Sequence, residues 1–124
     1  MKTTATALQM LIRLSGVILI ILGGLFWSHM ALQWMGLHMI LGFVLVLALW
    51  VLALLGARAG VSMGMVGVAL VWGLLVVFVG VKQTSLMPGS AHWVIQVIHL
   101  VLGLGAMGLG EALGARIKRS LVAA

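Results

Sequence analysis

The chain has 124 residues, of which 65% are apolar and only 6% are charged, a balance that predicts an integral membrane protein and excludes a soluble domain. It has no cysteine, which excludes disulfides and thiolate-bound metals, and its single acidic side chain, Glu111, excludes catalysis by two carboxylates of one chain. The net charge of +6 comes from basic residues at the ends of apolar runs, so we expect no nucleic-acid partner.

Four apolar segments reach the roughly 20 residues that a membrane-spanning helix needs. The expected helices cover residues 7–27, 32–55, 62–81 and 91–115. The short segment 56–60 leaves room only for an antiparallel hairpin, and the polar segment 82–90, which holds the only proline, predicts an exposed loop. The sequence therefore predicts an all-α polytopic membrane protein, a single domain over residues 1–124 that forms an antiparallel four-helix bundle of two hairpins.

The basic residues separate the two ends of this bundle. Lys82 alone follows the third helix, whereas the other six lie in or near the termini and the middle turn, namely Lys2, Arg13, Arg58, Arg116, Lys118 and Arg119. The positive-inside rule then predicts that both termini face the cytoplasm. We expect a multi-pass protein of a bacterial-type inner (plasma) membrane. Glu111 would lie near the cytoplasmic end of the fourth helix, where Arg13 or Arg116 can pair with it.

Two histidines lie inside the expected second and fourth helices, which enter the membrane from the same side. His38 and His99 have comparable depth, and each is followed four residues later by a glycine on the same helix face, Gly42 and Gly103. A buried imidazole needs a partner, and a haem iron bonded to one nitrogen of each ring satisfies both. We expect a haem b near the outer leaflet, with His38 and His99 as axial iron ligands and the glycines beside the flat macrocycle.

The other two histidines are candidates for contacts with the haem propionates at the membrane surface. His92 precedes His99 by two helical turns on the same face, and His29 lies in the first loop. The simpler interpretation is that both are interfacial residues. A closed metal site of four neutral histidines is disfavoured, because it would leave the metal charge uncompensated in an apolar shell.

Three segments resemble one four-helix half of the haem A synthase family, and they are similar to small four-helix b-type membrane cytochromes: HMILG at 38–42, WGLLVVFVG at 72–80 and VIHL at 97–100. In that family a histidine on the second and fourth helices of each half flanks haem near the outer face. The resemblance carries this role to His38 and His99. The chain lacks a second half, a cysteine pair and an acidic residue in the first outer loop, so the resemblance implies haem binding rather than haem-modifying catalysis.

Two protein ligands leave the iron no open position, which favours electron transfer over oxygen chemistry. We therefore expect a non-catalytic electron carrier or a haem-holding subunit of a larger redox assembly. Its surroundings are the lipid bilayer, and a quinone or a redox partner protein would complete the electron path. Homo-oligomers and hetero-oligomers both stay open.

Two other functions also stay open. The first is a haem-free structural or assembly subunit, whose glycine-rich faces bind partner helices and whose histidines form interhelical hydrogen bonds. The second is a small cation exporter of the four-helix multidrug type, although the first helix lacks the deep carboxylate that such transporters use.

Overall fold

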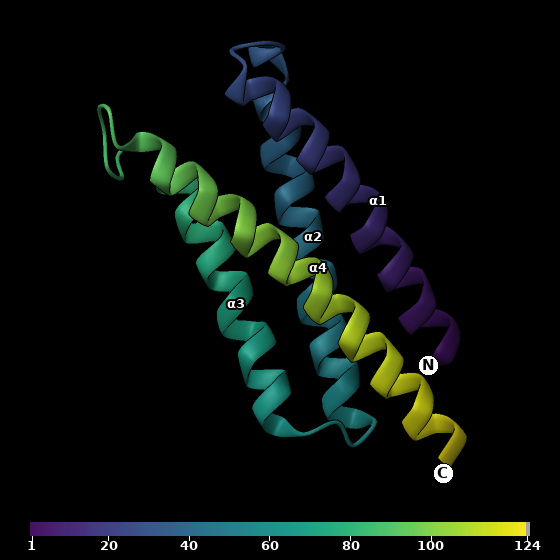
Figure 1. Ribbon diagram of the computed structural model, residues 1–124. Helices are drawn as coiled ribbons and strands as arrows, with labels where there is room; N and C mark the ends of the chain where they lie inside the picture. The colour runs from purple at the N-terminus through teal and green to yellow at the C-terminus, as the bar shows by residue number, and fades with distance from the viewer. Residues whose placement is uncertain (124) are drawn as a thin grey trace.

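The computed structural model describes residues 1–123, and within this range it contains four long helices and no strand. Figure 1 shows α1 (Lys2–Trp27), α2 (Met35–Arg58), α3 (Met63–Lys82) and α4 (His92–Ala123), with a short 3-10 helix, η1 (Leu32–Trp34), before α2. All four long helices have the length and apolar composition needed to cross a membrane. The predicted all-α, four-helix transmembrane fold is confirmed.

The helices extend further than hydropathy predicts. The first begins at Lys2 rather than at residue 7, and the last continues to Ala123 rather than ending at residue 115. Hydropathy marks the part of a helix that lies in hydrocarbon, whereas the backbone stays helical for as long as one face is packed. Here Ala5 of α1 and Ile117 of α4 are fully buried, so the extra turns are supported by packing.

The second helix also differs from its predicted range. Residues 32–34 form η1 instead of the first turn of α2, and α2 continues to Arg58 rather than ending at residue 55. Ala31, directly before η1, has φ +56°, a left-handed conformation that closes the turn after α1. The regular α-helix begins at Met35, three residues after the predicted start at residue 32.

α2 and α4 occupy the centre of the bundle. They contact each other and both outer helices, whereas α1 and α3 are not in contact within the described residues. Five of the six largest fully buried side chains come from these two helices, and the sixth comes from α1. They are Leu49, Leu52 and Val46 of α2, Leu113 and Ile117 of α4, and Ile12 of α1. The two helices that carry the predicted iron ligands are thus direct neighbours.

Tryptophan–glycine contacts join α2 to α3 and α3 to α4. Trp50 donates its indole N–H to the carbonyl of Leu70 at 3.1 Å, and Trp72 donates to the carbonyl of Leu102 at 2.8 Å. Each ring lies directly on a glycine of the next helix: a Cβ atom added at Gly73 would overlap Trp50, and one at Gly105 would overlap Trp72.

The connections between helices lie at alternating ends of the bundle. Both chain ends and the α2–α3 turn are at the lower end in Figure 1, and the other two connections are at the upper end. Gly60 adopts φ +85° in the α2–α3 turn, and Ser62 caps α3 by accepting a hydrogen bond from the N–H of Met65. The termini and this turn therefore share one side of the predicted membrane.

Candidate functional site

The structure brings the imidazoles of His38 and His99 together between α2 and α4. His38 lies in the first turn of α2, and His99 lies two turns into α4. Their ring centroids are 6.3 Å apart, and the ring planes make an angle of 51°. Both helices start at the upper end of the bundle in Figure 1, so the pair lies near the end opposite to the chain termini.

Each of these rings carries a buried polar atom without a partner. The Nδ1 atoms of His38 and His99 are both buried, and neither has a hydrogen-bond partner among residues 1–123. A buried polar atom left unpaired costs about 1–3 kcal/mol, so such an atom in a folded protein calls for an explanation. Apolar packing holds at least one ring in place, since Phe26 of α1 contacts His38 edge-on with ring centroids 5.3 Å apart.

Two glycines of the outer helices approach the histidine pair. A Cβ atom added at Gly80 of α3 would lie 3.0 Å from Cε1 of His99, and one at Gly23 of α1 would lie 3.7 Å from Cε1 of His38. Neither glycine was among the site residues predicted from the sequence. The available signal was their place near the outer ends of the first and third helices, at a depth similar to that of the histidines.

The glycines that the sequence did assign to the site, Gly42 and Gly103, occupy a different environment. A Cβ atom added at either position would have no atom within 4 Å apart from the backbone of its own helix and the neighbouring residues. They therefore leave open space one turn from each histidine. Their role beside a macrocycle stays a prediction.

The other two candidate histidines lie at the upper end of the bundle in Figure 1, one in the α1–α2 connection and one at the start of α4. His29 is exposed in the turn after α1 and has φ +58°. His92 is the first residue of α4, and its Nδ1 atom lies 3.2 Å from the carbonyl oxygen of Leu86, which it contacts as a hydrogen-bond donor. This bond ties the α3–α4 loop to the start of α4, and a contact of either histidine with propionates stays a prediction.

A second polar cluster joins α1 to α4. Arg13 donates to both carboxylate oxygens of Glu111, at 2.5 and 2.8 Å, so Arg13 rather than Arg116 is the partner that the sequence left open. Gln9 is only 3% exposed; its amide N–H₂ donates to Glu111 at 3.3 Å, and its oxygen accepts from Lys118 at 2.6 Å. Because both oxygens of the only acidic side chain are engaged, this carboxylate is poorly suited to carry a cation.

Gln9, one helical turn before Arg13 on the same face of α1, was not among the residues predicted from the sequence. A lone glutamine at the start of an apolar run has no distinctive pattern. Its burial follows from the packing of α4, where a Cβ atom added at Gly114 would overlap the Gln9 side chain.

Within residues 1–123, no group of three or more histidine, aspartate or glutamate side chains lies close enough to hold a metal ion. Comparison with family models, curated proteins and solved structures gave no match. The resemblance to the haem A synthase family therefore stays a prediction, and the function has to be inferred from this chain's own residues.

Proposed function

We propose that this membrane protein binds one haem b between α2 and α4, with His38 and His99 as the two axial ligands of the iron. It acts as an electron carrier or as a haem-holding subunit of a redox assembly. The observation that carries the proposal is the separation of the two imidazole rings, whose centroids are 6.3 Å apart.

This separation suits two imidazoles that bond one metal from opposite sides. A metal–imidazole bond is about 2 Å long, which puts the centroids of two such rings about 6 Å apart. The angle of 51° between the ring planes is compatible with this arrangement, because each ring can rotate about its own bond to the metal.

The set of donors supports a haem rather than a bare metal ion. Two neutral imidazoles without a third ligand cannot complete the coordination of a free ion. A porphyrin supplies four further nitrogens, and its two negative charges neutralise ferrous iron, which lowers the cost of placing the metal in an apolar environment. The open space beside Gly42 and Gly103 supports the same group, because a helix surface without side chains there admits a flat macrocycle.

Bound haem supplies reversible one-electron oxidation and reduction. His38 and His99 would hold the iron through their two imidazoles, which would leave no open position for oxygen and would favour electron transfer. Phe26 packs against His38, and the backbone at Gly80 packs against His99, so the rings are held before the cofactor binds. A quinone or a redox partner protein would exchange the electron.

The membrane orientation belongs to the same proposal. The ends of the chain and the α2–α3 turn carry most of the basic residues, and this end would face the cytoplasm of a bacterial-type inner membrane. The haem would then lie toward the outer leaflet.

An absorption spectrum of the detergent-purified protein tests the haem, both as isolated and after addition of haemin. Reduction should give a sharp Soret band and split visible bands, the signature of a six-coordinate haem. His38→Ala and His99→Ala should each abolish this spectrum, because the one ring left in each variant cannot bind the iron from both sides. His92→Ala is the control for iron ligation: it removes a histidine that is not a proposed iron ligand, so the six-coordinate bands should stay although a propionate contact would be lost.

A colourless protein that takes up no haemin would contradict the proposal. The remaining candidate would be the haem-free assembly subunit, which one observation favours independently. Cβ atoms added at Gly64 and Gly67 of α3 would meet no atom of another helix within 4 Å, so this stretch is open to a partner helix.

A further inference from the structure

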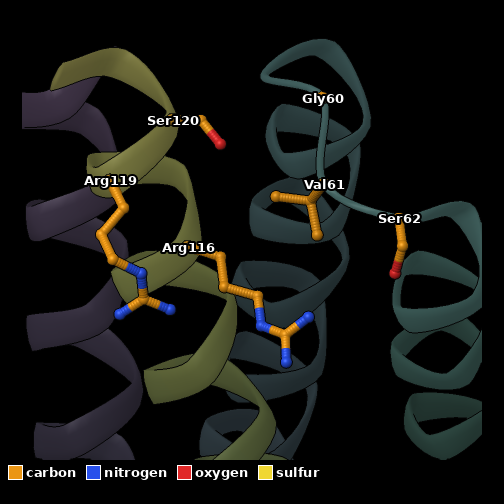
Figure 2. A pocket seen from close by; sticks show the side chains of 6 residues that line it. All are labelled: Gly60, Val61, Ser62, Arg116, Arg119 and Ser120. Carbon is orange, nitrogen blue, oxygen red and sulfur yellow. The ribbon is translucent and has the colours of Figure 1, made fainter. Parts of the chain in front are cut away.

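A pocket lies at the end of the bundle that carries both termini, between the α2–α3 turn and the last turns of α4. It has a volume of about 310 Å³ and opens to the outside; its lining residues, shown in Figure 2, are Gly60, Val61, Ser62, Arg116, Arg119 and Ser120. Three of them come from consecutive positions of the turn. The other three share one face of α4, because residues three and four apart in a helix are neighbours.

The pocket is positively charged, and the chain offers no acidic side chain to neutralise it. Figure 2 shows the Arg116 side chain reaching from α4 toward the turn, with the Ser120 hydroxyl also on the side of the turn. Arg116 and Arg119 are both exposed. Glu111, the only acidic side chain in the sequence, is bonded to Arg13.

These groups suit an anion with several oxygen atoms. A guanidinium group donates two parallel hydrogen bonds to a phosphate, and hydroxyl groups such as those of Ser62 and Ser120 donate a further bond each. The Ser62 oxygen already accepts a bond from the Met65 N–H, which leaves its own hydrogen available to a ligand. The start of α3 beside Ser62 adds a smaller partial positive charge.

The position of the pocket along the bundle indicates where the anion comes from. α3 has 20 residues and is therefore about 30 Å long, which equals the thickness of the hydrocarbon core. Ser62 directly precedes α3, so the pocket lies at the level of the lipid headgroups. Met63, the next residue, is 68% exposed and offers an apolar surface to an acyl chain.

We propose that this pocket is a phosphate site that holds the headgroup of an anionic phospholipid. Basic pockets between helices at a membrane surface bind such headgroups. Free phosphate has the same chemistry and is the other source. This site is about a membrane thickness away from the histidine pair, and the proposal does not depend on haem.

The test uses the full chain in nanodiscs of phosphatidylcholine, with and without phosphatidylglycerol. Native mass spectrometry after transfer to detergent counts the lipids that stay bound. The wild-type protein should retain one phosphatidylglycerol per chain. Arg116→Gln and Arg119→Gln should each weaken its binding by roughly fivefold to tenfold, and the double variant should abolish it.

Arg58→Gln is the matched control, because Arg58 is an exposed arginine at the same end of the bundle that does not line the pocket. It removes the same charge and should leave the retained lipid unchanged. Equal weakening by Arg58→Gln and Arg116→Gln would overturn the proposal, since it would indicate attraction to general surface charge.

A second experiment distinguishes the two sources of phosphate, the lipid headgroup and the free anion. Inorganic phosphate is titrated calorimetrically into the protein in phosphatidylcholine nanodiscs. Retained phosphatidylglycerol without a phosphate signal identifies the lipid headgroup. Millimolar phosphate binding that Arg116→Gln removes identifies the free anion and overturns the assignment to lipid. If neither probe binds, the pocket is not a phosphate site.

Discussion

The imidazole of His99 is in contact with a helix backbone that has no side chain at that point. The free space at Gly80 is small, because an added Cβ atom would lie 3.0 Å from Cε1 of His99. At Gly23 the corresponding distance to Cε1 of His38 is 3.7 Å, an ordinary van der Waals contact. Two glycines with similar positions beside the two histidines should therefore respond differently to the same substitution.

We expect Gly80→Ala to displace the His99 ring by a few tenths of an ångström, which weakens haemin binding and destabilises the haem-free protein. Overpacking costs about 1–3 kcal/mol, and the higher helix propensity of alanine offsets roughly 0.5–1 kcal/mol of it. Haemin titration and thermal unfolding of the haem-free protein measure the two effects separately. Gly23→Ala is the control, and an equal loss in both variants would show that the close approach at Gly80 has no special role.

Two pairs of neighbouring helices are joined by the same kind of contact. The indole N–H of one helix donates to a backbone carbonyl of the next, and the ring covers a glycine three residues after that carbonyl. Trp50 of α2 does this at Leu70 and Gly73 of α3. Trp72 of α3 does the same at Leu102 and Gly105 of α4. Apolar helices in lipid gain little from burial as such, so close backbone approach and interhelical hydrogen bonds set their register.

Gly105→Ala should destabilise the protein by about 1–3 kcal/mol, because the new methyl group overlaps the Trp72 ring and strains its bond to Leu102. Gly108→Ala is the control: Gly108 lies about one turn further along α4, and its added Cβ would meet no atom of another helix within 4 Å. It should be neutral or stabilising by about 0.5–1 kcal/mol. Denaturation in detergent, followed by circular dichroism and tryptophan fluorescence, compares the two. Equal stability of both variants would contradict the role of the Trp72–Gly105 contact.

The whole molecule is polarised along its length, with the histidine pair near one end and the basic pocket at the other. The charge distribution sets the orientation of such a bundle in a membrane. The pocket and the termini would then face the cytoplasm, where anionic headgroups are available, and the histidine pair would lie toward the outside.

The orientation can be measured with single cysteines, because the natural chain has none. Thr3 is exposed at the start of α1, and Ser85 is exposed in the loop at the opposite end. In intact cells, a membrane-impermeant maleimide should label Ser85→Cys and should label Thr3→Cys only after lysis. The cysteine-free protein controls for background, and the reverse pattern would show that the bundle has the opposite orientation.

The sequence by itself determined how many times the chain can cross a membrane, that the helices are antiparallel, and which end carries the positive charge. These properties depend on local hydropathy, on the thickness of the bilayer and on short connections, all of which can be read along the chain. It also singled out His38 and His99, because an ionisable side chain is conspicuous within an apolar run.

Only the tertiary structure decided which helix faces meet. A transmembrane helix is apolar on all sides, so its sequence carries no hydrophobic stripe that indicates the inward face. The facing surfaces are set instead by the fit between large side chains and glycines: indoles pack on Gly73 and Gly105, and Gln9 is buried against Gly114. The 6.3 Å spacing of the histidine rings follows from that packing, and so does the direction of the Arg116 side chain toward the α2–α3 turn (Figure 2).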